Sequence, residues 1–367
     1  MWYNPAWFYR KQITVDYTKV VAALTGFPVL ISLDSDAQLA SYAQADGDDI
    51  LFTDSNNAKL SHEIEKFVSG TGELVAWVKA PALSNTADTV LYMYFGNPAA
   101  ASQQDAVNVW DANYIGVWHK KDATTTTIAD STANGLTGNK RAVGEPAETA
   151  GQIAFAQSYD GLDDYIQVPS NDVMDAPSEL TAEAWLYDRN DGTQGHSFNR
   201  DTHGVRIWII RRDTDTTVNW HIFNSSGDLK MFCPAGSWAI NTWFHIACTA
   251  KVVAPNIVME VFFNGVSRGT AAFTGAAIQT GVCAMQMGAD NTEGSSLKKQ
   301  LMDEARFSNI VRSAEWLLTE YNNQSSPGTF YGMADMTRRL PQQPPFEPHG
   351  VLTNLQVGSV PFRGDVL

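Results

Sequence analysis

The sequence has few cysteines and no long apolar run. Cys233, Cys248 and Cys283 all lie in the second half of the 367 residues. An odd number of cysteines without paired spacing gives no disulfide framework, so we expect buried free thiols and a reducing compartment. The apolar runs are short and alternate with polar residues, which argues against a transmembrane helix. The opening MWYNPAWFYRKQITV lacks a basic region followed by an apolar stretch, so no secretion signal is predicted.

Basic residues are also scarce. The chain has 25 Lys and Arg against 40 Asp and Glu, a formal charge of -15. This sign argues against nucleic acid or an anionic membrane as the main partner. A hydrophobic content of 44% excludes general disorder, and the length suits two domains with a tail.

Familiar catalytic signatures are missing as well. The sequence has no Gly-x-Ser-x-Gly elbow, phosphate loop or dinucleotide fingerprint. The histidines lack the spacing of a zinc site. Glu63 and Glu65 lie two apart on one predicted strand, as a glycosidase pair might, but we interpret them as ordinary surface charge. We therefore predict a protein that is not an enzyme.

The first hundred residues alternate as strands do. Apolar residues recur at every second position in runs separated by Gly, Asn, Asp and Pro: 13–15, 27–33, 50–52, 74–78 and 90–95. In the second run Val29, Ile31 and Leu33 share one face. This spacing favours an antiparallel sandwich.

The same region carries motifs of a known family. WFYRKQITVDYTKV, GFPVLISL, DDILFTD, LSHEIEKF, LVAWVKAP and TVLYMYFGNP follow one another in the order found in domain of unknown function 2341. The first hundred residues resemble that family, which often precedes a laminin-G-like module. The resemblance implies a domain boundary rather than a chemistry.

From Tyr114 onward the motifs resemble a laminin-G-like, or concanavalin A-like, jelly roll: IGVWHKKD, IADSTANG, SYDGLDDYIQVP, LTAEAWLY, TWFHIACTA, VFFNGVSRG and LMDEARFS. Asn264-Gly265 marks a hairpin turn, and Ser313 begins a closing helix. The predicted fold is all-β: two tandem antiparallel β-sandwich domains, 1–100 and 114–332, joined by a linker at 101–113 and followed by an extended Pro-rich arm at 333–367.

The arm differs in charge from the remainder of the chain. Three arginines and two acidic residues give Met336 to Leu367 a formal charge of +1, which leaves -16 for the other residues. We expect such an arm to dock on a partner or on another copy of the chain. The residues predicted to do so are Arg338, Arg339, Phe346 and Phe362.

The second domain also suggests calcium. Concanavalin-like sandwiches often bind this ion, which takes oxygen ligands from loops. The resemblance points to Asp130, Asn134, Asp160, Asp163, Asp164 and Asp303. The alternative is structural: the first two make a turn, and the Asp163-Asp164 pair caps a strand.

Asp303 has a structural interpretation of its own. In the pattern Leu301, Asp303, Ala305, Phe307 it faces the apolar side of a strand, so it needs a partner. We predict a buried pair with Arg312. Glu304 and Arg306 then point the other way, toward solvent.

Aromatic residues offer stacking surfaces for sugars. Trp208, Trp220, Trp238 and Trp243 are candidates, although core packing is the alternative for each of them, and Trp185 and Trp243 lie in core-strand motifs. Since recognition usually occurs on loops, the predicted ligand-binding residues are Trp238, His203 and Arg206.

The tandem pairing of these two domains resembles proteins encoded by bacterial viruses as well as larger bacterial surface proteins, and the short length, the absence of a secretion signal, the cysteine usage and the arm favour the viral case. The resemblance thus implies a non-enzymatic structural protein of a bacteriophage particle, assembled in the host cytoplasm, as head decoration or tail adhesion component. Its laminin-G-like domain would bind carbohydrate or protein, and its partners would be other virion proteins, copies of itself and host surface glycans. The alternative is a carbohydrate-active enzyme, or an accessory carbohydrate-binding module, of a bacterial protein.

Overall fold

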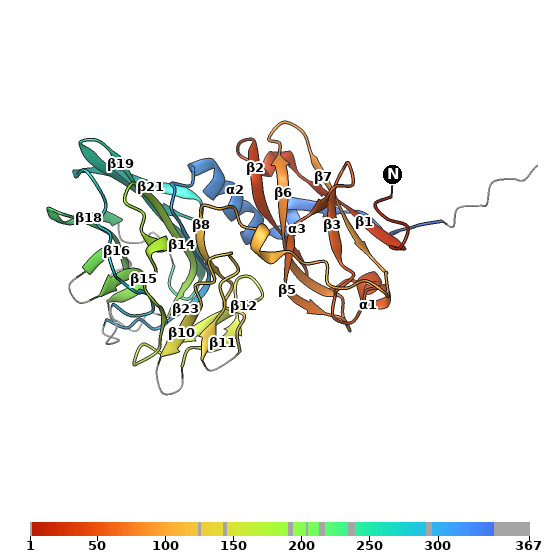
Figure 1. The fold of residues 1–367 in the computed structure, drawn as a ribbon, viewed down its shortest axis with the longest axis horizontal. Coiled ribbons are helices and arrows are strands. Elements are labelled where there is room, and N and C mark those ends of the chain that lie inside the picture. Colours follow the sequence, from red (N-terminus) through yellow and green to blue (C-terminus); the bar gives the residue numbers. More distant parts are fainter. Residues whose placement is uncertain are drawn as a thin grey trace, which may run out of the picture.

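Alternating apolar residues produce two β-sandwiches that lie side by side in the computed structural model (Figure 1). The structure describes residues 2–123, 126–141, 145–189, 194–202, 205–212, 217–233, 239–290 and 296–340. Trp238, His203, Phe346 and Phe362 lie outside these ranges. The all-β prediction is confirmed. Among the described residues, no helix is long and apolar enough to cross a membrane.

The first sandwich packs a six-stranded sheet against a three-stranded one. The larger sheet has the order β24-β1-β7-β3-β4, with β25 also on β1. Its strands are β1 (Tyr9–Val15), β3 (Leu51–Asp54), β4 (Lys59–Leu60), β7 (Thr89–Phe95), β24 (Tyr331–Met333) and β25 (Thr337–Arg338). The smaller sheet, β2-β6-β5, has β2 (Leu24–Leu33), β5 (His62–Val68) and β6 (Glu73–Leu83). The short helices η1 (Tyr17–Lys19) and α1 (Ala37–Tyr42) lie between strands of this sandwich, and η2 (Ala106–Asn108) lies between β7 and the second sandwich. The five strands predicted in this region are present as β1, β2, β3, β6 and β7.

The second sandwich has two eight-stranded sheets. The front sheet runs β18-β17-β16-β15-β22-β13-β10-β9. Its strands are β9 (Thr127–Ile128), β10 (Gly138–Arg141), β13 (Tyr165–Val168), β15 (Gly195–Thr202), β16 (Val205–Arg212), β17 (Val218–Asn224), β18 (Gly227–Cys233) and β22 (Met285–Met287). A core of Trp, Phe, Ile and Met side chains separates it from the back sheet, and Trp208 and Trp220 lie fully buried in that core.

The back sheet runs β11-β12-β23-β14-β19-β20-β21, with β8 also on β23. Its strands are β8 (Tyr114–Trp118), β11 (Ala147–Ala150), β12 (Phe155–Tyr159), β14 (Glu179–Asp188), β19 (Trp243–Val253), β20 (Asn256–Phe263), β21 (Val266–Thr274) and β23 (Gln300–Ser308). The helix η3 (Asp172–Met174) follows β13. Asn264 and Gly265 both have positive φ, so the predicted two-residue hairpin turn is confirmed. All three cysteines are free and buried, as expected.

The helix α2 (Ala314–Ser325) lies between the two sandwiches (Figure 1). The hydroxyl of Ser313 caps it by accepting from the Trp316 backbone N–H, as predicted. Trp316 packs on Phe27 of the first sandwich with the ring centroids 4.9 Å apart. One continuous cluster of buried apolar side chains therefore spans both sandwiches and includes Trp77, Trp110, Tyr114, Val117, Trp185, Phe262, Trp316 and Leu317.

The chain returns to the first sandwich after α2. Following α3 (Pro327–Phe330), β24 pairs antiparallel with β1, with Tyr331 opposite Val15, and β25 pairs with the other end of β1. The sequence places the arm from residue 333. In the structure the first residues of this segment are instead strands of the first domain's sheet, and the Arg339 N–H donates to the Phe8 carbonyl.

Candidate functional site

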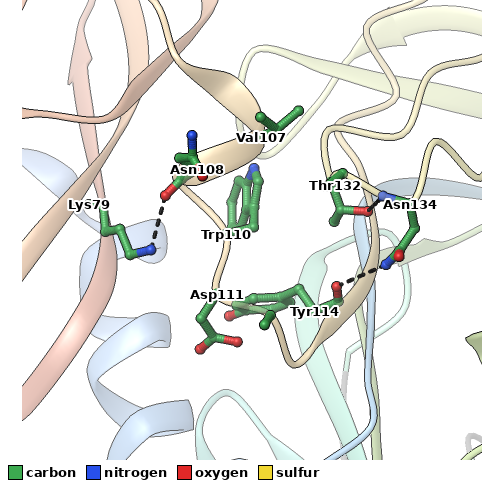
Figure 2. A pocket seen from close by; sticks show the side chains of 10 residues that line it. Lys79, Val107, Asn108, Trp110, Asp111, Tyr114, Thr132 and Asn134 are labelled. Atoms are coloured by element: carbon green, nitrogen blue, oxygen red, sulfur yellow. Dashed lines mark hydrogen bonds between the residues drawn. The ribbon is translucent and has the colours of Figure 1, made fainter.

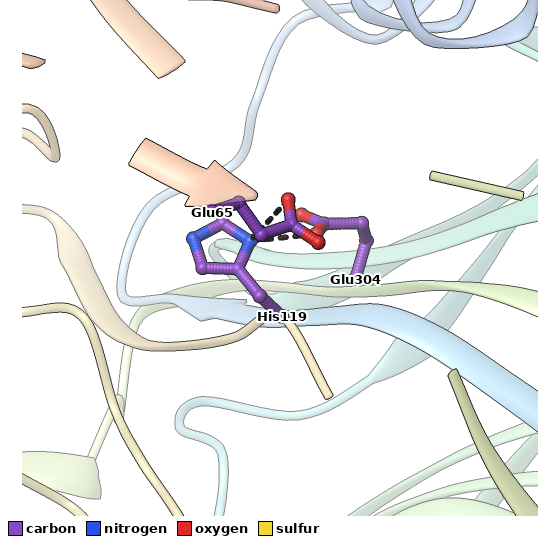
Figure 3. Close-up of side chains that lie close together, drawn as sticks. All are labelled: Glu65, His119 and Glu304. Atoms are coloured by element: carbon purple, nitrogen blue, oxygen red, sulfur yellow. Dashed lines mark hydrogen bonds and ion pairs between the residues drawn. The ribbon is translucent and has the colours of Figure 1, made fainter. Parts of the chain in front are cut away.

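A cluster of charged side chains is buried where the two sandwiches meet (Figure 3). His119, just after β8, lies with Nδ1 2.6 Å from Glu304 Oε1 and 3.7 Å from Glu65 Oε2. Its Nε2 lies 3.3 Å from Glu63 Oε2. Because β5 supplies Glu63 and Glu65 while β23 supplies Glu304, the imidazole joins the two domains. These residues and Arg306 are called the interdomain cluster below.

The pKa values of the interdomain cluster are mutually shifted. Burial alone would lower the pKa of His119, but Glu304 and Glu63 raise it to about 10. Burial and the neighbouring Glu304 raise the pKa of Glu65 to about 8. Burial would raise the pKa of Glu63, yet His119 and Lys121 hold it well below its usual range. At neutral pH the imidazolium therefore lies between ionised Glu63 and Glu304, and Glu65 is protonated.

Arg306 completes the interdomain cluster. Its Nη2 lies 2.6 Å from Glu304 Oε2, and its Nη1 binds Glu320 of α2. The guanidinium is 4.6 Å from the ring centroid of Trp77 and 5.0 Å from that of Trp110. Both indoles donate to the cluster, Trp77 to Glu65 and Trp110 to Glu63. Glu63, Glu65, Glu304 and Arg306 were expected on solvated faces, and this expectation is wrong because the two sandwiches bury them against each other.

The predicted Asp303–Arg312 pair is also wrong. Arg312 instead forms a bidentate pair with Asp111 of the linker, at 2.7 and 2.9 Å, and lies 3.9 Å from the ring centroid of Tyr114. Asp303 Oδ2 accepts from the Ile153 N–H at 2.8 Å.

A bulge in β23 explains the error. Glu304 has φ +48°, and the pairing with β14 shifts register there. The extra residue interrupts the alternation, so Met302, Ala305 and Phe307 face the sandwich core. Asp303 pairs with Trp185, which belongs to the cluster shared with the first sandwich.

The predicted calcium ligands separate into three places. Asp130 accepts from the N–H groups of Val117, Thr132 and Leu136, and Asn134 donates to the Ile115 carbonyl, so both organise a loop. Asp303 lies at the domain interface. Only the remaining three come together: Asp160, Asp163 and Asp164 each offer a carboxylate oxygen within 4.8 Å of the others.

A cleft of about 320 Å³ opens beside the linker, between Lys79 of the first sandwich and Thr132 to Asn134 of the second (Figure 2). Its polar groups bind the neighbouring backbone. Lys79 Nζ donates to the Asn108 carbonyl at 3.0 Å, and Asn134 Nδ2 points to the carbonyl oxygens of Tyr114 and Ile115. We interpret the cleft as part of the junction.

The outer face of the front sheet carries a different arrangement. Cross-strand pairing places seven residues in one line over seven strands, from β18 to β10. We call this line the polar row: Lys230, His221, Ile209, Asn199, Gln286, Gln167 and Asn139. The adjoining residues Ile222, Ile210, Phe198, Met287 and Ile166 lie in the core, so the polar row lies on the opposite face.

The centre of the polar row is buried with polar atoms unpaired. Asn199 and Gln286 are each 0% exposed. Oδ1 of Asn199, Oε1 and Nε2 of Gln286, and Nε2 of His221 lack a hydrogen-bond partner, as does Nδ1 of the adjacent His196. Burial lowers the pKa of His196 to about 4 and also lowers that of His221, so both imidazoles are neutral. Neutral imidazoles and amides both donate and accept hydrogen bonds.

The margins of this face are open. Phe232 is 65% exposed, and the Arg206 side chain is 60% exposed with its guanidinium 5.8 Å from the ring centroid of Phe223. A cavity of about 330 Å³ includes Asn139 at the far end of the polar row. Of the predicted ligand-binding residues, Arg206 lies here. Trp208 and Trp220 pack in the core instead.

The sequence analysis missed Asn199, Gln286 and His221. Gln286 and His221 each lie between two apolar residues, in MQM and WHI, and Asn199 lies between Phe198 and Arg200, so all three resemble the ordinary solvent face of a strand. Only the cross-strand register brings them into one line.

Two family models match the chain. Residues 160–317 match the concanavalin A-like lectin/glucanases superfamily, and residues 46–132 match a domain of unknown function (DUF2341). The predicted order of the two domains is therefore confirmed. The second match extends through His119, so it includes Glu63, Glu65 and His119 of the interdomain cluster. No curated protein matches the chain.

Several solved structures are similar to part of this chain at low sequence identity. The binding domain of Paraclostridial Mosquitocidal Protein 1 is 13% identical with a TM-score of 0.46, over 57% of this chain and 52% of that chain. The receptor-binding domain of botulinum neurotoxin C/D mosaic serotype is 12% identical with a TM-score of 0.47, over 58% and 51%. Domain 4 of AbnA, a GH43 extracellular arabinanase from Geobacillus stearothermophilus, is 17% identical with a TM-score of 0.44, over 58% and 100%. The match spans about half the length of the first two.

Proposed function

We propose that this chain is a non-enzymatic glycan-binding protein whose ligand contacts the outer face of the front sheet. The observation that carries the proposal is the set of unpaired polar atoms on Asn199, Gln286 and His221. A buried polar atom without a partner costs about 1–3 kcal/mol, so folding alone does not favour this arrangement. A ligand that supplies the missing hydrogen bonds would offset that cost, and because Asn199 and Gln286 are sealed from solvent in the structure, it reaches them only in a conformation that opens this face.

Sugar hydroxyls suit these atoms. Each hydroxyl both donates and accepts, and the polar row offers amide oxygens, an amide nitrogen and neutral imidazoles. The ring of Phe232, which is 65% exposed, lies on the same face, where it could pack on the apolar side of a pyranose. The match of residues 160–317 to a lectin and glucanase superfamily supports the same ligand class.

Binding is favoured over hydrolysis. Cleavage of a glycosidic bond needs two carboxyl groups across the sugar. The polar row itself contains amides, an imidazole, an ammonium group and an apolar side chain, and the neighbouring carboxylate of Asp228 is held by His221 and Lys230, each at 3.1 Å. The paired carboxylates Glu63 and Glu65 are sealed between the sandwiches, away from the front sheet.

The test is a glycan screen of the purified chain followed by titration of a hit with variants. Gln286→Leu removes the unpaired amide and keeps the volume, so we expect a normal fold and at least about tenfold weaker binding, equivalent to 1.4 kcal/mol. Thr270→Ala, on an exposed position of β21 in the back sheet, is the control and should bind normally. Unchanged affinity of the Gln286 variant, or no bound glycan, would overturn the site. Hydrolysis of a polysaccharide by the purified chain would overturn the proposal that the protein is not an enzyme.

We further propose that the protein is a structural component of a phage particle, in head decoration or tail adhesion. The support is the sequence resemblance of the tandem domains. The segment that leads into the predicted arm is anchored on β1, so residues beyond it would start from a fixed point on the first sandwich. Many copies on one particle would turn weak glycan contacts into firm attachment. Mass spectrometry and antibody labelling of purified particles test this location, and particles that lack the protein would contradict it.

A further inference from the structure

A second group of buried titratable side chains lies beside the interdomain cluster. Glu183 of β14, His245 of β19 and Glu320 of α2 each offer one ligand atom, and these atoms lie within 4.8 Å of one another. Each residue is at most 2% exposed. Since β14 and β19 are paired strands, Glu183 and His245 project from the same face of the back sheet toward α2.

The hydrogen bonds in this group are incomplete. Both carboxylate oxygens of Glu183, Oε2 of Glu320 and Nδ1 of His245 have no partner. Only the other oxygen of Glu320 is engaged, by Arg306 and by Gln324. Two buried carboxylates this close are stable only if they share a proton, in keeping with the raised pKa that burial and Glu320 give Glu183, or if a cation lies between them.

The interdomain cluster provides a comparison within the same molecule. Glu65, His119 and Glu304 are the same residue types at similar spacing. There, both nitrogens of His119 contact carboxylates, and Glu304 binds both His119 and Arg306. Of Glu65, His119 and Glu304, only Glu65 has an unpaired atom, Oε1, whereas the second group leaves three carboxylate oxygens of Glu183 and Glu320 unpaired close to Nε2 of His245.

We propose that Glu183, His245 and Glu320 bind a divalent transition-metal ion, Zn²⁺ or Mn²⁺, that ties α2 to the back sheet. An imidazole with two carboxylates suits these ions better than calcium, which prefers oxygen ligands alone. Glu183 has both oxygens available, so bidentate binding would give four ligand atoms.

Distances and charge both fit the ion. A metal about 2.1 Å from each ligand holds tetrahedral ligand atoms about 3.4 Å apart, and His245 Nε2 lies 3.7 Å from Glu183 Oε2. Arg306 of β23 is the cross-strand neighbour of Glu183 on β14. Its positive charge is balanced by the carboxylate of Glu304. The two carboxylates Glu183 and Glu320 then balance a divalent cation.

The role of the ion would be structural. α2 also contacts the first sandwich, through Trp316 on Phe27 and through Asn323 on the backbone of Leu30. A metal bound by Glu320, in the middle of α2, would therefore fix the helix that connects the two domains. The front sheet is not involved, so this site is independent of glycan binding.

The first measurement is the metal content of the intact chain. Because the site is buried, the protein is unfolded in chelator and refolded with Zn²⁺, Mn²⁺, Ca²⁺ or no metal, then dialysed, analysed by plasma mass spectrometry and melted. We expect one equivalent of Zn²⁺ or Mn²⁺ to remain, with a melting temperature several degrees above that of the metal-free protein. Ca²⁺ should not be retained by Glu183, His245 and Glu320, so any rise in melting temperature that it causes elsewhere should be the same for the unaltered chain and for Glu183→Gln. No retained metal and identical melting temperatures would overturn the site.

Variants distinguish a bound metal from a proton shared between Glu183 and Glu320. Glu183→Gln keeps the shape and removes a ligand charge, so we expect it to fold, to lose the bound metal and to melt alike with and without Zn²⁺. Glu65→Gln, in the interdomain cluster, is the matched control and should keep the metal. Equal metal retention by both variants would overturn the assignment. If the Glu183 variant fails to fold, the metal content of the unaltered chain still decides.

Discussion

Asn323 of α2 binds the backbone of Leu30 as a neighbouring strand would. Its Oδ1 accepts from the Leu30 N–H at 2.7 Å, and its Nδ2 donates to the Leu30 carbonyl at 3.0 Å. Two residues along, the Tyr331 hydroxyl makes both bonds with Ser32, each 2.9 Å long. Since β2 is the edge of its three-stranded sheet, these side chains satisfy an edge that could otherwise pair with another chain.

The first prediction concerns this edge. Asn323→Ala leaves a buried N–H and carbonyl of Leu30 without partners, so we expect a loss of about 3 kcal/mol in the free energy of unfolding. Asn322→Ala breaks one partly buried bond to the Lys19 carbonyl and should cost about 1 kcal/mol or less. Urea unfolding of both variants measures the difference, and equal losses would contradict the role of Asn323.

The second prediction concerns pH. His119 has its pKa raised from 6.5 to about 10. Its charge therefore stabilises the folded chain fully below about pH 6.5, progressively less above it, and not at all beyond about pH 10. We expect the melting temperature of the unaltered chain to fall between about pH 7 and pH 10. His119→Gln should start lower and fall less over the same range. If the melting temperatures of the two proteins fell by the same amount between pH 7 and pH 10, this account of the interdomain cluster would be refuted.

A third prediction uses two glycines with similar backbone angles. Gly265 has φ +72°, and an added Cβ would lie 2.7 Å from the Leu318 Cα of α2. Gly135 has φ +61° with nothing within 4 Å. Gly265→Ala should thus lower the free energy of unfolding by about 3 kcal/mol and Gly135→Ala by about 1 kcal/mol. Only the Gly265 substitution adds a clash between the new Cβ and the backbone of α2. Chemical denaturation checks both values, and a larger loss at Gly135 would show that α2 does not press on the hairpin.

The fourth prediction concerns calcium. The carboxylates of Asp160, Asp163 and Asp164 are the ones predicted from sequence that come together in the structure. We expect millimolar calcium to raise the melting temperature and Asp163→Asn to remove that rise. Asp130→Asn should lower stability with and without calcium alike, because that side chain organises a loop. An unchanged melting temperature after chelation would remove calcium from the account.

Local patterns sufficed for the all-β class, the first-domain strands and the Asn264-Gly265 turn, because period-two alternation and turn residues act over a few positions. The interdomain cluster could not be foreseen in the same way. Glu63 and His119 are 56 positions apart, and only domain packing brings them together.

The polar row and the β23 bulge escaped prediction for related reasons. Asn199 meets Gln286 through pairing of distant strands, which no local pattern reports. The positive φ of Glu304 shifts alternation by one residue, so the strand pattern that paired Asp303 with Arg312 failed at that point.

The return of β24 and β25 to β1 has a consequence for synthesis. As the chain leaves the ribosome, the first sandwich emerges with β1 lacking one neighbour and β2 lacking the side chains of Asn323 and Tyr331. Both edges stay open until more than three hundred residues have been translated, so a stalled or truncated chain would present two sites for strand-to-strand association. The domain that is made first is thus the one that is finished last.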